Sequence, residues 1–278
     1  MTSQIVRKAG VYNQCLQFIL AVTVPERQKQ MKPTDGPDFP HFIAHNANGS
    51  YCVPDLFAGR EVPGVLAAGG IYEPRTLERL RELSSGGDIV TGGAFVGDFL
   101  PFLGRCLAPG AQIISFEPHP LTWKAAQHTL WLNGLDRVTV HNVAVGEKAD
   151  VLPLRLSRPD GTPMAAASRL APDAAQAAGD PSNDKVVNVD VVPLDDLVGT
   201  DRAVSVLHLD VEGHEEPALR GAARILQRCR PAVVLEGAGP KRSGGFLAVL
   251  GQLAPEAGYA ISDVIEGEGN VVFLPNPA

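Results

Sequence analysis

Three carboxylates follow three predicted strands: Glu117, Asp210 and Glu236. Each comes directly after a short apolar run of the kind that forms a buried strand. In an open parallel sheet, ligands bind beyond the carboxyl ends of the strands, so the three acids are expected to meet at one site. A single acid at a strand end is often an ordinary solvated side chain, but three of them together favour a functional site.

The stretch from Asp88 to Pro120 predicts the elements that would position the first of these acids. We expect a strand, a turn, a helix and then a second strand that ends at Glu117. Glycine permits a sharp turn and lets a ligand approach the backbone, and the turn contains Gly92, Gly93 and Gly97. Glu117 comes twenty positions after the last of these glycines. An acid at that spacing accepts hydrogen bonds from ribose hydroxyls in nucleotide-type sites.

The residue at position 94 narrows the choice of nucleotide. A dinucleotide-binding turn would need glycine there, so that the backbone could meet a pyrophosphate, but this chain has Ala94. A ribose-binding acid without a pyrophosphate cradle fits an adenosine ligand that lacks phosphates, and S-adenosylmethionine is the obvious candidate. The alternative is that the segment is only a strand, turn and helix of an ordinary α/β core.

A denser cluster surrounds the second acid and consists of His208, Asp210, Glu212 and His214. The first three would share one face if the strand continued that far, because side chains alternate along a strand. Carboxylates and imidazoles suit divalent cations, but the spacing matches no zinc motif, and no metal is predicted. Alternatively, these acids accept backbone N–H bonds and orient loops. Neither G-x-S-x-G nor G-x-x-x-x-G-K-[ST] occurs, which disfavours serine hydrolysis and phosphoryl transfer.

The composition fits one large domain, or one domain with an extension. The chain has 278 residues, of which 45% are apolar, and a net charge of −7 with a pI near 5.5. Such a charge argues against a general nucleic-acid or anionic-membrane surface. The apolar run at 11–24 is too short to span a bilayer and lacks a signal-peptide cleavage site, so a docking helix is expected there. The four cysteines, Cys15, Cys52, Cys106 and Cys229, form no C-x-x-C pair, so neither a zinc site nor a disulfide framework is indicated. Reduced thiols in a cytoplasmic protein are expected.

The order of the predicted elements indicates a doubly wound α/β sheet preceded by a small cap. Residues 1–86 are expected to form an N-terminal extension and cap, in which Asn48-Gly49 predicts a β-hairpin. Residues 87–278 then alternate strands and helices, which implies a sheet with right-handed crossovers.

Five local expectations concern the core. Residues 137–145 predict one strand, and Asp98 is placed to cap the helix that follows the glycine turn. Residues 157–185 contain few large apolar residues and are expected to form a mobile loop. A glycine-rich loop is expected over 237–245, followed by a helix over 246–254.

Several short motifs occur in an order and at a spacing that are similar to those of a known family. The motifs are IYEPRTL (71–77), GGAFVGDFLPFL (92–103), FEPHP (116–120), HNVAVGE (141–147), VPLDDL (192–197), LHLDVEGHE (207–215) and PAVVLE (231–236). The most specific is D-V-E-G-x-E, followed by an L-x-G-A turn that starts at Leu219. With these motifs, residues 71–236 resemble the FkbM-type family of S-adenosylmethionine-dependent methyltransferases.

The resemblance implies a class I methyltransferase fold, which is a Rossmann-like, doubly wound, mostly parallel sheet of seven strands, here with a small N-terminal hairpin and helix cap. It also implies S-adenosylmethionine as cofactor, bound across the first two strands. By position, Glu117 would hold the ribose, and 142–144 would pass near the adenine. Glu73 and Thr76 would approach the methionine end. The full expected cofactor set is Glu73, Thr76, Gly92, Gly93, Ala94, Gly97, Glu117, Pro118, Asn142, Val143 and Ala144.

The same resemblance implies a reaction, namely O-methylation of a hydroxyl on a sugar or secondary metabolite. The expected base is Asp210, with His214 and Glu236 as alternatives. The expected partner is a small-molecule or glycan acceptor, without nucleic acid or a membrane span, and a homo-oligomer is left open.

Three positions depart from the family pattern. Thr91 replaces an acid, Phe95 replaces an Asn, and His208 replaces a Lys. The first two alter the methionine end of the expected cofactor site. They motivate a second hypothesis, a non-catalytic binding or scaffold protein that retains the fold. A nicotinamide-dependent oxidoreductase is a third hypothesis, disfavoured by Ala94.

Overall fold

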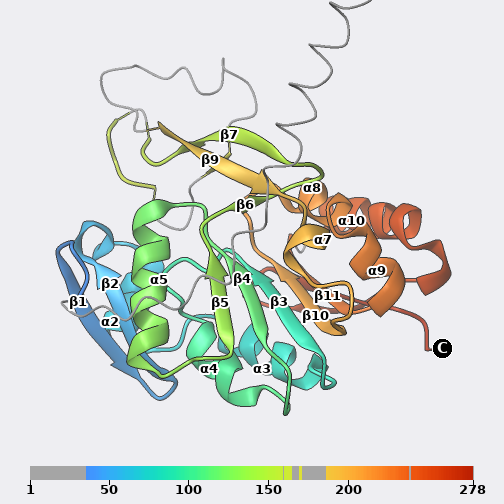
Figure 1. Ribbon diagram of the computed structural model, residues 1–278, viewed down its shortest axis with the longest axis horizontal. Coiled ribbons are helices and arrows are strands. Elements are labelled where there is room, and N and C mark those ends of the chain that lie inside the picture. The colour runs from blue at the N-terminus through green and yellow to red at the C-terminus, as the bar shows by residue number, and fades with distance from the viewer. Residues whose placement is uncertain (1–35, 159, 165–168, 171–185, 238, 278) are drawn as a thin grey trace, which may run out of the picture. The chain divides into compact units, whose positions relative to one another are not determined.

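The computed structural model describes residues 36–158, 160–164, 169–170, 186–237 and 239–277 (Figure 1). The docking helix expected at 11–24, and most of the loop expected at 157–185, lie outside the described residues. Within the described residues, no helix combines the length and the apolar character that crossing a membrane requires.

A seven-stranded sheet forms the centre of the described chain. From one edge to the other, the order is β12 (Ala260–Ile265), β13 (Asn270–Leu274), β11 (Ala232–Glu236), β10 (Val204–Leu209), β3 (Asp88–Gly92), β4 (Ile113–Phe116) and β5 (Val138–His141). Only β13 runs antiparallel to its neighbours. The predicted fold class, a mostly parallel seven-stranded sheet, is therefore confirmed.

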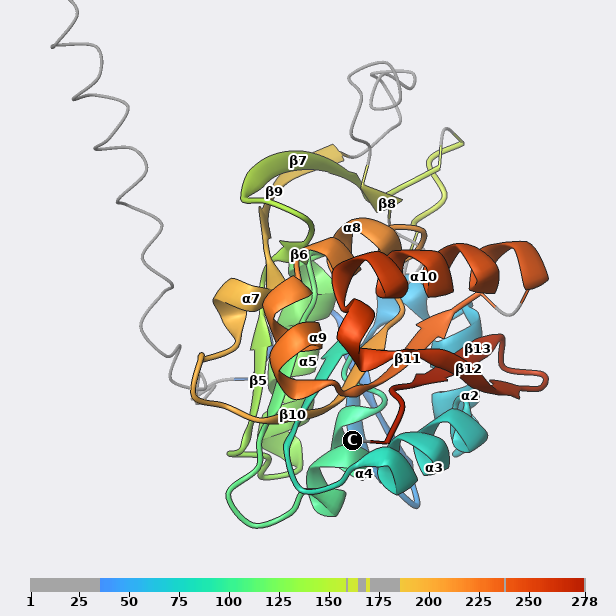
Figure 2. The ribbon, with the colours of Figure 1, turned by 90° about the vertical axis from the view of Figure 1, so that its right-hand side faces the viewer.

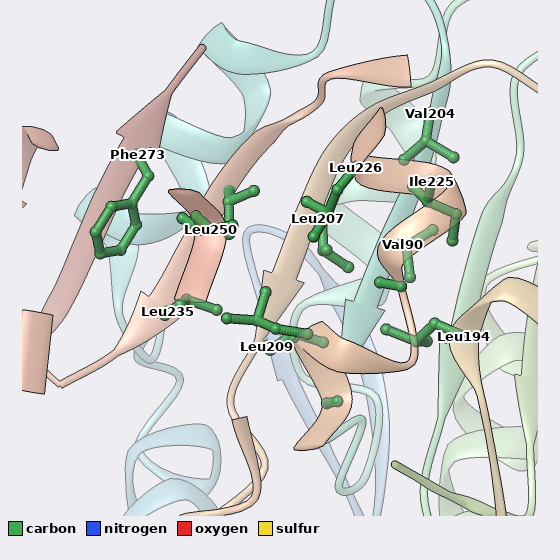
Figure 3. Packing of buried hydrophobic residues seen from close by; sticks show 14 of the residues in the cluster. Val90, Leu194, Val204, Leu207, Leu209, Ile225, Leu226, Leu235, Leu250 and Phe273 are labelled. Carbon is green, nitrogen blue, oxygen red and sulfur yellow. The ribbon is translucent and has the colours of Figure 1, made fainter. Parts of the chain in front are cut away.

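Helices cover both faces of this sheet (Figures 1 and 2). One face carries α7 (Leu194–Leu197), α8 (Glu215–Arg220), α9 (Ala223–Cys229) and α10 (Pro240–Leu253), and the other carries α3 (Pro74–Leu83), α4 (Leu100–Cys106) and α5 (Pro120–Leu132). Consecutive residues of one strand point to opposite faces of the sheet, because side chains alternate along a strand. Figure 3 shows the first face, where Leu207 of β10 lies near Leu226 of α9 and Leu209 belongs to the same core. Val206, the residue before Leu207, belongs to the core of the other face.

The predicted strand over 137–145 is wrong, because this segment contributes to two different sheets. β5 ends at His141, and β6 (Ala144–Val145) then joins a smaller sheet with β9 (Val186–Val192), β7 (Asp150–Arg155) and β8 (Arg169–Leu170). The amide of Asn142 donates to the carbonyl oxygens of Glu117, at 2.8 Å, and Pro118, at 3.3 Å. These bonds hold the chain where it leaves the large sheet. The alternation of apolar and polar residues stops at Asn142, and Val143, Ala144 and Val145 are all apolar, so the end of β5 was visible in the sequence.

The predicted hairpin is confirmed, but β1 (His41–Asn46) and β2 (Gly49–Pro54) are joined by Ala47 and Asn48, so Gly49 is already the first residue of β2. A short 3-10 helix, η1 (Asp55–Phe57), and α2 (Glu61–Ala67) follow it. The hairpin packs on α5, where the N–H of Cys52 donates to Thr129 Oγ1 at 3.0 Å. Phe57 shares a core with Phe95 and Val96 of the glycine turn. The hairpin therefore helps to fix that turn, while the boundary at residue 86 stays a prediction.

Two further expectations fail at helix starts. The loop expected over 237–245 is shorter, because α10 already begins at Pro240. Proline is well suited to the first turn of a helix. Ser243 and Phe246 are buried, so α10 is anchored on either side of Gly244 and Gly245. Asp98 does not cap α4, which starts at Leu100 without a side-chain capping bond. A further 3-10 helix, η2 (Pro255–Ala257), leads into β12.

Candidate active site

Two adjacent cavities lie at the carboxyl ends of the central strands. The Glu117 cavity, of about 470 Å³, is lined by predicted residues Gly93, Glu117, Pro118, Ala144, Asp210 and His214. The Glu73 cavity, of about 700 Å³, is lined by predicted residues Glu73, Gly92, Gly93, Ala94, Asp210 and Glu236. Gly93, Asp210 and Glu212 line both cavities, so these residues form the boundary between the two compartments.

Glu117 is held rigidly at the end of β4. Its Oε2 accepts the backbone N–H of Phe95, and its Oε1 accepts the N–H of His119, both at 2.8 Å. Burial raises the pKa of Glu117 to about 7, against the two backbone hydrogen bonds, which favour the ionised form. A carboxylate has about four acceptor positions, so about two remain for a ligand. The side chain is therefore fixed in place and still able to bind hydroxyl groups.

The glycine turn brings β3 against the residue that follows β10. Gly93 has a φ of +79°, and a Cβ there would overlap the carbonyl oxygen of Asp210. A Cβ at Gly92 would overlap the ring of Phe116. Gly97 lines neither cavity, and a Cβ there would meet Thr129 of α5. Gly92 and Gly93 thus make the close approaches at the site, whereas Gly97 allows the turn to pack on α5.

Phe95, which stands where the family has an Asn, does not line the Glu117 cavity. Its ring lies 6.0 Å from that of Phe57, in the core shared with the hairpin, and it forms part of the wall of the Glu73 cavity. The space beside Glu117 is therefore not occupied by the Phe95 ring.

Glu73 enters the second cavity from the residue before α3. Its Oε2 accepts a hydrogen bond from Asn270 Nδ2 at 2.9 Å. Burial raises its pKa to about 7, helped by the charges of Glu268 and Glu236 and opposed by the bond from Asn270. Thr76 lines neither cavity, and its hydroxyl instead accepts a hydrogen bond from the same Asn270 amide at 3.0 Å.

Backbone strain gathers at the Glu73 cavity. Among the described residues, four non-glycine residues have a positive φ, and three of them line this cavity: Glu73 at 43°, Phe95 at 45° and Glu212 at 54°. Such conformations cost about 1–3 kcal/mol each and persist only where the surroundings enforce them. They are typical of sites where side chains must be presented in one fixed direction.

The three predicted catalytic residues are not equivalent. Asp210 lines both cavities, whereas His214 lines only the Glu117 cavity and Glu236 only the Glu73 cavity. The pKa of Asp210 is raised well above its ordinary value, first by burial and then by repulsion from Glu236, Glu212, Glu73 and Glu215. Burial lowers the pKa of His214. Asp210 is thus the candidate that can reach ligands in both compartments.

Of the residues expected near the adenine, some line a cavity and others do not. Pro118 and Ala144 line the Glu117 cavity, whereas Asn142 and Val143 line neither cavity. Asn142 instead holds the backbone of Glu117 and Pro118, as described above, and Val143 packs against the core of the α8–α10 face. Their contact with a cofactor stays a prediction.

Glu215 was not predicted as a site residue, although it ends the D-V-E-G-x-E motif and holds the turn after Asp210. It is 1% exposed, and its Oε1 accepts the N–H groups of Gly213 at 3.0 Å and Val211 at 3.3 Å. Its Oε2 accepts from Arg242 of α10 at 2.7 Å. The available signal was its place in the D-V-E-G-x-E motif, but an acid in the first turn of a helix commonly indicates only an interaction with the helix dipole.

Other lining residues were also missed. Leu154 and Leu170 of the smaller sheet contribute to the Glu117 cavity, and Ser115 and Asp98 contribute to the Glu73 cavity. Within the part of the chain that the structure describes, no three His, Cys, Asp or Glu side chains are placed to share a metal ion.

The sequence profile of the methyltransferase FkbM domain matches residues 92–261, more than half of the chain. The chain belongs to this family. The resemblance drawn from the motifs is therefore confirmed, and residues 92–261 form a methyltransferase FkbM domain. No curated protein sequence matches the chain.

Solved structures with a similar fold include a methyltransferase FkbM from Methylobacillus flagellatus, 18% identical, with a TM-score of 0.47. That similarity covers 76% of this chain and 52% of the other, so this chain spans about half the length of that FkbM protein. A Geobacter sulfurreducens methyltransferase is 15% identical over 79% of this chain and 89% of its own, with a TM-score of 0.43. A Bacillus cereus O-methyltransferase in complex with SAH is 13% identical over 74% of this chain and 82% of its own, with a TM-score of 0.41. The family assignment rests on the sequence profile alone.

In this FkbM protein, replacing Asp98 with asparagine should stabilise the fold more at pH 8 than at pH 5. Burial raises the pKa of Asp98 to about 7, with smaller contributions from Glu73 and Glu117. A carboxyl whose pKa is raised by folding favours the fold at low pH and loses that contribution as pH rises through about 7. The neutral asparagine avoids that loss, so the gain at pH 8 should exceed the gain at pH 5 by about 1–3 kcal/mol.

The measurement is urea unfolding of both proteins at each pH. His119 and His208, whose pKa values are lowered to about 4, act in the opposite direction in both proteins. Only the difference between variant and wild type therefore isolates Asp98. An equal gain at both pH values would show that the Asp98 carboxyl is not perturbed.

Proposed function

We propose that this FkbM-family protein is an S-adenosylmethionine-dependent methyltransferase that methylates a hydroxyl on a sugar or a secondary metabolite. The observation that carries the proposal is the fixed carboxylate of Glu117, which lies beside the glycine turn in the Glu117 cavity. Asp210 lines both this cavity and the adjoining Glu73 cavity. Family membership supports the methyltransferase part of the proposal.

The residues present fit the cofactor. The Glu117 cavity offers a carboxylate for ribose hydroxyls and apolar walls at Val145, Leu154 and Leu170 for a base. The adjoining Glu73 cavity offers carboxylates that suit the ammonium and sulfonium charges of the methionine end. Glycine at position 93 lets a ligand pass from one compartment to the other without meeting a side chain.

The bound cofactor supplies an electrophilic methyl group, whose carbon bonds to the acceptor oxygen while the sulfur retains the electrons of the broken bond. The protein has two tasks in this reaction. It must align the acceptor hydroxyl, which can lower the barrier by roughly 7–11 kcal/mol. It must also accept the hydroxyl proton, and Asp210 is the proposed acceptor because it contacts both compartments and its raised pKa makes it a stronger base.

Calorimetric titration with S-adenosylhomocysteine tests the cofactor assignment. We expect Glu117→Ala to weaken binding about 10–100-fold, the usual worth of hydrogen bonds to a charged group. Exposed Glu147, just after β6, provides the control Glu147→Gln, which should bind as wild type does. Because Glu117→Ala also strands two buried N–H donors, both variants should first be shown to be folded at the temperature used.

Two outcomes would count against the proposal. Equal affinity in wild type and Glu117→Ala would remove Glu117 from the cofactor site. Absence of binding to wild type at millimolar S-adenosylhomocysteine would favour the scaffold hypothesis that Thr91 and Phe95 motivate.

A further inference from the structure

A row of three polar side chains crosses the floor of the Glu73 cavity. His208 of β10 pairs in register with Thr91 of β3, which pairs in register with Ser115 of β4. Residues opposite one another on neighbouring strands point to the same side of the sheet. All three line the cavity and are almost fully buried, with exposures of 3%, 5% and 0%. The large sheet therefore presents hydroxyl and imidazole groups to this cavity. The neighbouring positions of the sheet carry aliphatic side chains instead.

Two atoms of this row lack a hydrogen-bond partner. Thr91 Oγ1 and His208 Nδ1 lie 2.9 Å apart, but His208 Nε2 and Ser115 Oγ are buried with no partner. The ring of Phe99 stacks on the imidazole at 5.6 Å and keeps it in one orientation. Buried polar atoms without partners are rare in folded proteins, because they lose their hydrogen bonds to water. Their presence in a cavity wall indicates that a bound molecule supplies the missing bonds.

The walls of the same cavity are acidic. No lysine or arginine lines it. Five acidic side chains do, namely Glu73, Asp98, Asp210, Glu212 and Glu236. Burial and mutual repulsion raise the pKa values of Glu73, Asp98 and Asp210, so these charges are costly until a cation arrives. S-adenosylmethionine carries a sulfonium and an ammonium against one carboxylate, a single net positive charge. The cavity thus offers more acidic side chains than the two cationic groups of the cofactor would need as partners.

The geometry favours an organic cation over a metal ion. Among the described residues, no three potential metal ligands are placed around a common point. An alkylammonium group has three N–H donors and no acceptor. Carboxylate oxygens, a serine oxygen and a neutral imidazole nitrogen can all accept such bonds, and burial lowers the pKa of His208 to about 4, which keeps the ring neutral. If Nδ1 carries the ring proton toward Thr91, then Nε2 is an acceptor.

We propose that the methyl acceptor carries a protonated primary amine, which the Glu73 cavity binds through its carboxylates, Nε2 of His208 and the hydroxyl of Ser115. The acceptor class is then an amino alcohol, such as an amino sugar, whose hydroxyl lies beside Asp210 while its ammonium occupies the polar row. This inference rests on the proposed function, because it assigns the substrate class of the same site.

The first experiment compares matched amine and hydroxyl probes on the full-length protein saturated with S-adenosylhomocysteine. The pairs are glucosamine with glucose, and trans-2-aminocyclohexanol with trans-cyclohexane-1,2-diol, titrated by calorimetry at pH 8. We expect each amine to bind at least tenfold more tightly than its hydroxyl partner. Equal affinities within the pairs, or no measurable binding of either amine, would overturn the inference.

The second experiment uses Ser115→Ala, which removes an unpartnered hydroxyl without removing a hydrogen bond from the fold. Its thermal midpoint should equal or exceed that of wild type, while its affinity for the two amines should fall about three- to tenfold. Exposed Glu82 of α3 lies outside both cavities and supplies the control variant Glu82→Gln. Unchanged amine affinity in Ser115→Ala would exclude the polar row from amine binding.

The order of the titrations separates this inference from the proposed function. If wild type does not bind S-adenosylhomocysteine, the proposed function itself fails. If the cofactor product binds normally but the amines do not, only the substrate class assigned here is wrong.

Discussion

Replacing Asp210 with asparagine is expected to lower the rate of methyl transfer by about 10²–10⁴-fold, the usual contribution of a positioned base. The substitution keeps the shape of the side chain and removes its ability to take a proton. Asp210 also borders both cavities, so its amide can still contact the cofactor and the acceptor. We therefore expect the loss in kcat, with less than a tenfold change in KM or in affinity for S-adenosylhomocysteine.

The measurement is steady-state kinetics with the acceptor that the binding experiments identify, accompanied by cofactor titration of each variant. Glu236→Gln and His214→Asn are the matched comparisons, because each changes a predicted alternative that borders only one cavity. Both should retain more turnover than Asp210→Asn. Full turnover by Asp210→Asn would transfer the base assignment to whichever of the two comparison variants is inactive.

Replacing Gly93 with alanine is expected to destabilise the protein by about 2–6 kcal/mol and to abolish cofactor binding. The residue has a φ of +79°, which costs a non-glycine residue about 1–3 kcal/mol. The new methyl group would also overlap the carbonyl oxygen of Asp210, and overpacking of this kind costs a similar amount. Relief requires β3 and the residue after β10 to separate, which disrupts the boundary between the two cavities.

Gly110→Ala is the matched control for this substitution. Gly110 has almost the same φ, +80°, but a Cβ there meets nothing within 4 Å. It lies in the loop before β4, away from both cavities. Chemical unfolding should show a loss of about 1–3 kcal/mol for Gly110→Ala, the cost of the backbone conformation alone. If the two variants were equally stable, the close contact at Gly93 would not constrain the fold.

The strand-end acids show which part of the site the sequence could predict. Glu117, Asp210 and Glu236 each follow an apolar run, and parallel strands carry their last residues to one edge of the sheet. The structure does place all three at that edge, beside Gly93. Their position at that edge could be predicted because it depends only on residue period, strand direction and topology. Glu117 and Glu236 line different cavities, and the role of all three acids stays a prediction.

Other parts depended on packing between distant segments, which no local pattern records. The polar row needs the register of β10, β3 and β4, and a shift of one residue would turn its side chains to the other face. The early start of α10 depends on buried Ser243 and Phe246. Thr76 and Asn142 carry the polar groups expected of cofactor contacts, but their partners are Asn270 and the backbone after β4.

The wall that the smaller sheet contributes to the Glu117 cavity has a consequence for how specificity can diverge. Leu154 and Leu170 pair across β7 and β8, and neither strand hydrogen-bonds to the seven-stranded sheet. Substitutions in these strands can therefore resize the compartment while every strand pair that carries Glu117, Asp210 and Glu236 stays intact. Recombination of residues 150–192 between relatives is a route to new ligand preferences on an unchanged catalytic frame.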